Sequence, residues 1–103
     1  MTDAAGEIVD TDNEVSEVSA DGVPAPIATA VLTHVVRSLV DDPDAVRVHH
    51  VEGRHRLKLE VTVGPGDLGR VIGRRGRTAT SIRTVVRAAA TRDAVDVDVD
   101  FVD

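Results

Sequence analysis

The chain has 103 residues, with 12 basic and 18 acidic side chains, no Cys, no Trp, no Tyr and one Phe. This length allows one small domain, and the absence of Cys excludes disulfides, thiolate metal sites and thiol nucleophiles. No stretch approaches the roughly 18–20 apolar residues of a membrane span, and the N-terminus lacks a basic, apolar leader. We therefore predict a cytoplasmic protein that does not enter a membrane.

The charge is unevenly distributed along the chain. Residues 1–22 carry seven acidic side chains and no basic one, so the rest has 12 basic against 11 acidic residues. Within that remainder, residues 64–92 hold seven Arg against Asp67 alone, a local balance of plus six. The acidic total thus conceals a basic segment.

Residues 1–22 are predicted to be a disordered acidic tail, and residues 23–103 to be the folded domain. The tail's scattered apolar residues cannot bury enough area to offset the entropy lost on ordering. Its simplest role is solubility. The sharper hypothesis is a tethered polyanion that competes with an anionic ligand for the basic segment.

Hydrophobic periodicity predicts six elements in the folded part. The first helix begins at Pro24–Pro26 and ends before Pro43, with an apolar stripe of Ile27, Val31, Val35 and Leu39. Two alternating strands follow at about 46–52 and 57–63, and a hairpin turn is expected near Gly53. Asp67 can cap a short helix through Ile72. A longer helix follows from Arg77 to about Arg92.

A last strand alternates from Val95 to Phe101, which completes the order αββααβ. Strands with one apolar face need helices on that face. We therefore predict an α+β fold in which three helices cover one face of a three-stranded sheet.

The segment between the two later helices is the strongest functional signal. It reads Val71-Ile72-Gly73-Arg74-Arg75-Gly76-Arg77-Thr78. Two glycines three residues apart allow a sharp turn and close backbone approach to a ligand. The next helix presents its free amides and positive dipole end there, and the arginines add charge. The pattern predicts a phosphate clamp.

With its flanking αββααβ order, this string resembles a type II KH domain, and specifically the small single-domain bacterial RNA-binding proteins of the KhpA type. The resemblance covers about residues 24–102. It implies a GxxG loop that holds the backbone of about four single-stranded nucleotides, with the bases in a groove between helices and a strand. The acidic tail departs from this compact pattern.

Carried over residue by residue, the resemblance makes Gly73 and Gly76 the backbone clamp and Arg74 and Arg75 the positions that face phosphate. Ile72 would form part of the groove floor. Arg77 and Thr78 would begin the next helix and add backbone contacts.

The resemblance also implies a homodimer, a KhpB (Jag-type) RNA-binding partner, and roles as an RNA chaperone and in cell-envelope growth. The composition agrees with this mode of RNA binding, because RRM and OB readers stack bases on aromatic rings and this chain has only Phe101. A KH groove works with aliphatic side chains and backbone contacts.

Three other patterns are weaker. Gly64-Pro65-Gly66-Asp67-Leu68-Gly69 is a literal GxGxxG, and Asp93 follows at about the spacing of a dinucleotide site. However, the strands before it form a hairpin and the helix after it is short, so a strand-to-helix turn is favoured. No Walker A sequence follows.

The four His residues and the Asp96, Asp98, Asp100 row do not have metal-site spacing. His49 and His50 should face opposite sides of a strand, and the aspartates lack a wrapping turn. A solvated sheet face and satisfied histidines are favoured, and no catalytic constellation is present.

The sequence thus predicts a non-catalytic RNA-binding protein without a cofactor. The alternative is a KH-fold protein–protein adapter, for example in ribosome assembly or an envelope-growth complex. Both loop glycines and two loop arginines are retained, which favours RNA.

Overall fold

A computed structural model describes residues 23–103, and the predicted tail, residues 1–22, lies outside the described residues. The helices and strands follow the predicted order αββααβ. They are α1 (Pro26–Leu39), β2 (Arg47–Glu52), β3 (Leu57–Thr62), α2 (Leu68–Ile72), α3 (Arg77–Ala90) and β4 (Val97–Phe101). Short 3₁₀ turns stand at Pro43–Ala45, Arg74–Gly76 and Thr91–Asp93.

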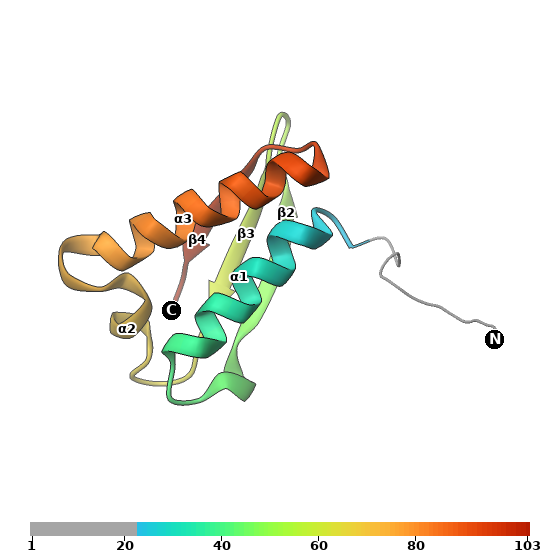
Figure 1. The fold of residues 1–103 in the computed structure, drawn as a ribbon. Coiled ribbons are helices and arrows are strands. Elements are labelled where there is room, and N and C mark those ends of the chain that lie inside the picture. The colour runs from blue at the N-terminus through green and yellow to red at the C-terminus, as the bar shows by residue number, and fades with distance from the viewer. Residues whose placement is uncertain (1–22) are drawn as a thin grey trace.

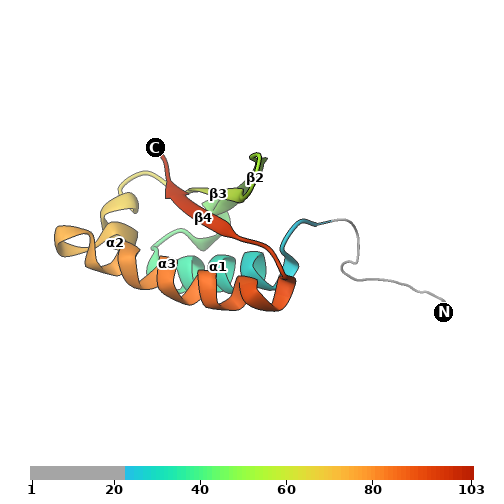
Figure 2. The ribbon, with the colours of Figure 1, turned by 90° about the horizontal axis from the view of Figure 1, so that it is seen from above.

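The three strands form one mixed sheet in the order β2-β3-β4. β2 and β3 pair as an antiparallel hairpin, whereas β3 and β4 are parallel. Figure 1 shows α1 and α3 crossing in front of the sheet, and Figure 2 shows the three helices in one layer on one side of it. The predicted two-layer α+β architecture is confirmed. None of the described helices is long and apolar enough to cross a membrane.

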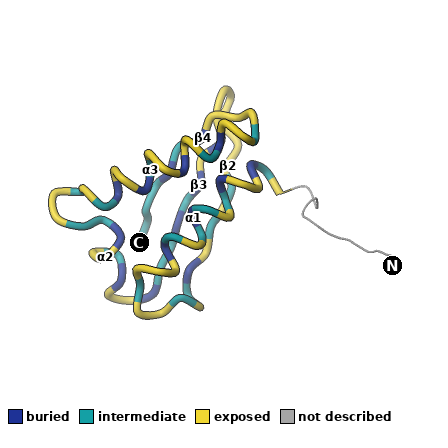
Figure 3. The backbone as a smooth tube through the Cα atoms, in the orientation of Figure 1, coloured by how far each residue is buried: buried dark blue, intermediate teal, exposed yellow. Residues whose placement is uncertain are grey.

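The core lies between these two layers, as the dark-blue segments in Figure 3 show. Leu59 and Val61 from the central strand, Leu32 and Val36 from α1, and Val86 from α3 are fully buried. Burying one such side chain contributes about 1.5–3 kcal/mol. Alternation on β3 and the i, i+4 spacing on the helices therefore produce a single continuous core.

The apolar stripe that predicts α1 lies one position away from the face that the helix buries. The buried face is Ala28, Leu32 and Val36, whereas Ile27 and Leu39 are 39% and 38% exposed. Val31 and Val35 pack at the margin of the core. Two adjacent rows of α1 are apolar, and the sequence alone does not distinguish them. The small Ala28 faces inward because the start of α1 lies against the end of α3.

The last strand is also shorter than predicted. It begins at Val97, and Val95 is 42% exposed in the turn before it. Ala94 stands in the left-handed region with φ 59°, so the chain turns sharply there before the strand starts. The alternation of Val97 and Val99 with aspartates continues as predicted.

Asp93 fixes the start of α1 from 65 residues away. Its two carboxylate oxygens accept hydrogen bonds from the backbone amides of Ile27 at 3.1 Å and Ala28 at 2.9 Å. These amides belong to the first turn of α1, where no intrahelical acceptor exists. Asp93 therefore caps α1 and joins it to the end of α3.

Candidate nucleic-acid interface

The loop between α2 and α3 has a backbone that favours glycine. Gly73 has φ 75° and ψ 176°, and Gly76 is left-handed with φ 72° and ψ 14°. Between them, Arg75 is also left-handed at φ 56°. The Gly76 amide donates a hydrogen bond to the Gly73 carbonyl at 3.2 Å, which closes the turn. The predicted sharp reversal between two helices is present.

The two glycines are required for different reasons. A Cβ on Gly73 would overlap the Thr78 hydroxyl and lie 2.7 Å from the Thr78 Cβ. A Cβ on Gly76 would meet no atom within 4 Å. Gly73 is thus fixed both by φ and by the close approach of α3, whereas Gly76 is fixed by φ alone.

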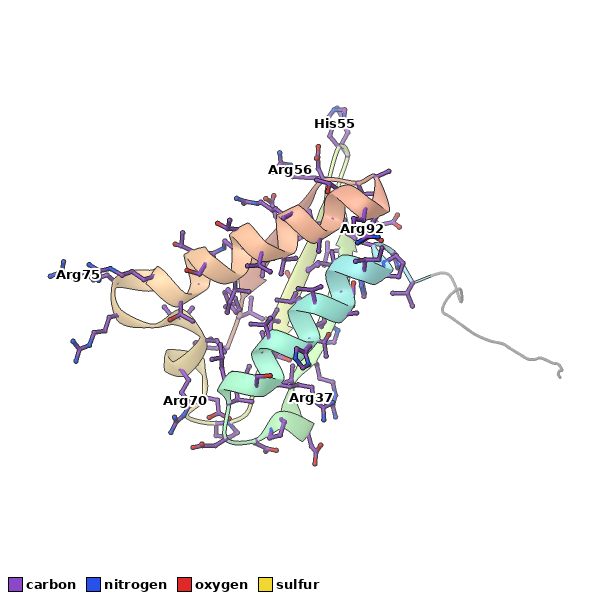
Figure 4. The ribbon with its side chains drawn as sticks, viewed as in Figure 1. Arg37, His55, Arg56, Arg70, Arg75 and Arg92 are labelled. Carbon is purple, nitrogen blue, oxygen red and sulfur yellow. The ribbon has the colours of Figure 1, made fainter. Side chains whose placement is uncertain are left out.

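The loop arginines lie in solvent. Arg74, Arg75 and Arg77 are exposed, and within residues 23–103 none of them forms an ion pair. Figure 4 shows Arg75 extending from the loop at one end of the molecule. These side chains are available to an anion from outside.

The start of α3 adds to this positive potential. The helix has 14 residues, its first turn contains no acidic residue, and no side chain caps it. The first amides of a helix lack intrahelical partners and carry the positive end of the dipole. A phosphate beside the loop would therefore meet amides as well as guanidinium groups.

The seven predicted site residues form one continuous surface segment. Ile72 ends α2 and is half-buried, Thr78 stands half-buried in the first turn of α3, and the loop lies between them. The fold therefore brings all seven together, although their contact with RNA stays a prediction.

Sequence comparison places this loop within a known family. The family model for the KhpA/KhpB KH domain matches residues 29–101. The chain belongs to the KhpA/KhpB KH-domain family. It is 45% identical over 73 residues to the RNA-binding protein KhpA of Halalkalibacterium halodurans, a match covering 71% of this chain and 96% of that protein. It is 56% identical over 68 residues to RNA-binding protein KhpA of Leifsonia xyli, covering 66% of this chain and 90% of that one.

RNA-binding protein KhpA of Mycobacterium tuberculosis is 46% identical over 76 residues, covering 70% of this chain and 95% of the relative. Among solved structures, Era in a complex with MgGDPNP and nucleotides 1506–1542 of 16S ribosomal RNA superposes with a TM-score of 0.57 at 14% identity. The superposition covers 97% of this chain but 45% of Era, and at that identity it shows the fold alone. The predicted type II KH fold is confirmed. The family is non-enzymatic, which agrees with the prediction of a non-catalytic protein.

The basic segment of this KH domain is divided between two roles. Arg70 pairs with Asp41 at 2.9 Å and with buried Asp67 at 3.4 Å. Arg87 pairs with Asp98 at 3.3 Å. The local charge of plus six is therefore partly neutralised within the fold, and the unpaired part is concentrated at the loop.

Arg83 makes a contact within the fold that the sequence did not identify. Its Nε donates a hydrogen bond to the Val99 carbonyl at 3.0 Å, on the edge of β4 that no strand covers. Its guanidinium also lies 5.4 Å from the centre of the Phe101 ring. The sequence showed Arg83 only as one of seven arginines, because the contact depends on how α3 crosses β4.

The GxGxxG string before α2 has a structural role. Asp67 is 2% exposed, and its carboxylate oxygens accept hydrogen bonds from the amides of Asp41 and Asp42, both at 3.1 Å. Asp67 stands at the N-cap position of α2, but its side chain makes no capping bond there. The predicted cap is therefore wrong, since the carboxylate joins the end of α1 instead.

The dinucleotide interpretation of this string fails on the same geometry. The strands before it form the predicted antiparallel hairpin, and α2 spans five residues. Asp93, the other acidic residue of that interpretation, binds the amides of α1. Both acidic side chains thus hold elements of the domain together.

The histidines are placed as their strand position predicts. His49 is exposed, whereas His50 is half-buried and its Nε2 lies 2.9 Å from the Thr29 hydroxyl. Burial lowers the pKa of His50, and the neighbouring His49 lowers it further. Among residues 23–103, no group of three or more His, Asp or Glu is arranged to hold a metal ion.

A cleft of about 460 Å³ lies at the other end of the sheet, between the start of α1, the β2–β3 turn and residues 94–96. None of the seven predicted site residues lines it. A loop that binds nucleic acid through backbone amides and exposed guanidinium groups needs no enclosed cavity. The loop geometry, and not the cleft, defines the candidate interface.

Proposed function

We propose that this protein binds single-stranded RNA through the loop Ile72–Thr78. The observation that carries the proposal is the pair of positive-φ glycines, which turn the chain between α2 and α3 and leave three arginines without ion pairs within residues 23–103. Several relatives at 39–56% identity are named RNA-binding protein KhpA, which supports the same conclusion.

In this proposal, phosphates lie against the loop and the first amides of α3. Arg74 and Arg75 supply the charge that attracts them, and Arg77 adds a third cation at the helix start. Bases would then extend past Ile72 toward α3 and β4. Because phosphate contacts carry no sequence information, sequence preference should be modest.

The finer features of the proposal rest on family membership. We propose a cytoplasmic RNA chaperone or post-transcriptional regulator that forms a homodimer, has a KhpB (Jag-type) partner and acts in cell-envelope growth. Val85, on α3, is 51% exposed, and Ile27 on α1 is 39% exposed. Exposed apolar side chains on the helix layer support association with a second copy. Dimerisation would also add a second weak RNA site.

The test is fluorescence anisotropy with a short single-stranded RNA over a salt series. We compare the natural protein with Arg74→Asp/Arg75→Asp and with a matched control, Arg54→Asp/Arg92→Asp. The control has the same net charge but changes it at the opposite end of the molecule, near the labelled His55 and Arg92 in Figure 4. Circular dichroism verifies that all three are folded.

We expect the loop variant to lose affinity by more than about tenfold at low salt. The slope of log affinity against log salt should fall by about 1.4, because each phosphate contact on a single strand contributes about 0.7. The control variant Arg54→Asp/Arg92→Asp should change the RNA affinity and the salt slope less than the loop variant does. Equal losses in the two variants would show that net charge, and not the loop, governs binding. If the natural protein does not bind RNA, the adapter hypothesis takes its place.

A further inference from the structure

The Arg83 side chain is held in place by two contacts with β4. Its Nε donates a hydrogen bond to the Val99 carbonyl at 3.0 Å, and its guanidinium lies 5.4 Å from the centre of the Phe101 ring. The hydrogen bond uses one of the five N–H donors of the guanidinium. The Nη1 and Nη2 atoms form no hydrogen bond or ion pair within residues 23–103. Arg83 therefore presents free donors from a fixed position.

Arg83 lies on the face of α3 that begins at the loop. It follows Gly76 by seven residues, or almost two helical turns, so the two residues share one face about 10 Å apart along the axis. Between them on that face, the Thr80 hydroxyl donates a hydrogen bond to the Gly76 carbonyl at 3.0 Å. Phosphates of one stacked strand are about 3.4 Å apart, so four nucleotides bridge this distance. A strand that contacts the loop and follows this face brings a base to Arg83.

This face of α3 borders an edge of the sheet that no strand covers, because β4 is last in the order β2-β3-β4. The Asp96 carbonyl and the Val102 amide bond to β3. Backbone groups of alternate residues point to opposite edges of a strand, so Val99 directs its amide and carbonyl to the open edge. The bond from Arg83 to the Val99 carbonyl agrees with this orientation. A base that approaches Arg83 therefore also meets backbone groups of β4.

The free donors of Arg83 match two adjacent hydrogen-bond acceptors. Guanine presents such a pair at O6 and N7, and cytosine presents one at O2 and N3. Adenine has an amino donor beside N1 and N7, and uracil has an N–H between its two carbonyls. A planar guanidinium distinguishes these two groups of bases, whereas the compact ammonium group of lysine has no such fork.

We propose that Arg83 contacts one base of the bound strand and selects guanine or cytosine through the pair of adjacent acceptors that these bases share. This inference rests on the proposed RNA-binding function of the loop. Phosphate contacts at the loop give affinity for any sequence, and Arg83 adds a preference at one nucleotide. Because Val99 and Phe101 already position the guanidinium, little side-chain entropy is lost when the base binds.

The test is fluorescence anisotropy with four short single strands: uridine throughout, or uridine with one central guanosine, cytidine or adenosine. The uniform background lets the protein choose the register that places the odd base at Arg83. The natural protein is compared with Arg83→Lys and with a matched control, Arg87→Lys, after circular dichroism shows that all are folded. Arg87 stands one turn farther along the same face, but its Nη2 pairs with Asp98 at 3.3 Å.

We expect the natural protein to bind the guanosine strand, the cytidine strand or both at least about fivefold more tightly than the other two strands. Arg83→Lys should lose this preference and change the affinity for the all-uridine strand little, because the charge is kept. Arg87→Lys should retain the preference. The loop variant Arg74→Asp/Arg75→Asp should weaken binding of all four strands by the same factor.

Three results would overturn the inference and leave the loop function intact. They are equal affinity for the four strands, a preference for adenosine, and a preference that Arg83→Lys retains or that Arg87→Lys loses equally. If none of the strands binds the natural protein at low salt, the proposed function fails and the inference fails with it.

A second measurement uses the natural protein alone and identifies the base atoms. A 7-deazaguanosine strand lacks the N7 acceptor of guanine, and a 3-deazacytidine strand lacks the N3 acceptor of cytosine, while each base keeps its carbonyl. Loss of the preference with the analogue of the preferred base supports a contact with both acceptors and tells guanine from cytosine. Unchanged affinity for that analogue overturns the inference.

Discussion

Two glycine-rich turns stand at opposite ends of α2. They differ in whether their charged side chains have partners within the described domain. The turn before α2 contains Asp67, which is buried and bonded to two amides at the end of α1. The turn after α2 contains Arg74 and Arg75, which are exposed and have no ion pair within residues 23–103. The sequences of both turns resemble ligand-binding loops. In the turn before α2, however, the charged side chain already has partners within the domain.

The difference shows how to separate structural from functional glycine motifs. In the first turn, the Asp67 carboxylate and the amides of Asp41 and Asp42, just after α1, satisfy one another. In the second, cations and the uncapped start of α3 point to solvent. Substitutions in the first turn should therefore change stability, and substitutions of the loop arginines should change binding.

The largest expected loss of stability is for Asp67→Ala. The substitution removes the acceptors of the Asp41 and Asp42 amides, which then lack partners in a partly buried position. We expect the free energy of unfolding to fall by about 3 kcal/mol, since each unsatisfied buried group costs about 1–3 kcal/mol. Urea unfolding followed by circular dichroism measures it.

Two matched variants sharpen that result. Asp67→Asn keeps one acceptor oxygen and should lose less stability than Asp67→Ala. Asp41→Asn removes only the exposed ion pair with Arg70 and should cost less than about 1 kcal/mol. An Asp67→Ala protein as stable as the natural one would contradict the structural role of this turn.

Within the open loop, the two glycines should respond differently to alanine. Gly73→Ala has both a strained φ and an overlap with Thr78, so we expect a loss of about 2 kcal/mol. Gly76→Ala meets no atom and has only the left-handed strain, about 1 kcal/mol. Thermal unfolding of the two variants compares them directly.

The double variant Gly73→Ala/Thr78→Ala tests the cause. Removal of the Thr78 hydroxyl relieves part of the overlap, so the double variant should be more stable than Gly73→Ala alone. If Gly73→Ala and Gly76→Ala unfold at the same temperature, close approach of α3 is not what fixes Gly73.

Local sequence patterns predicted the element order and the loop, because both depend on residues close in the chain. Alternation on β3 and the two glycines around Arg74 and Arg75 are examples. The candidate binding segment, residues 72–78, is continuous for the same reason: seven consecutive residues need no long-range contact to come together.

The sequence could not predict contacts between distant residues. Asp67 and Asp93 stood next to helices and suggested a helix cap and a dinucleotide ligand, whereas their partners lie 25 and 65 residues or more away. Likewise, α1 has two adjacent apolar rows, and only packing against α3 and the sheet selects Leu32 over Val31. The contact of Arg83 with the Val99 carbonyl could not be predicted either, because it depends on how α3 crosses the edge of β4.

The smallest expected effect is the pH dependence of stability that arises from the contact between His50 and Thr29. The His50 ring lies beside the Thr29 hydroxyl, and its pKa is lowered mainly by burial and also by His49. The folded state therefore disfavours the protonated ring relative to the unfolded chain, whose histidine has a pKa of about 6.5. The resulting stability is present above that value and is lost as pH falls through the lowered pKa of the folded state.

Unfolding experiments between pH 7.5 and about 5 should therefore show a decline in stability that His50→Gln reduces. His34→Gln, an exposed control on α1, should leave the decline unchanged. The loop lies away from the His50–Thr29 contact, so RNA affinity should not follow the same titration. If RNA affinity followed the titration of His50, the His50–Thr29 contact and the loop Ile72–Thr78 would be coupled. Protonation at the contact between α1 and β2 would then change binding at the loop.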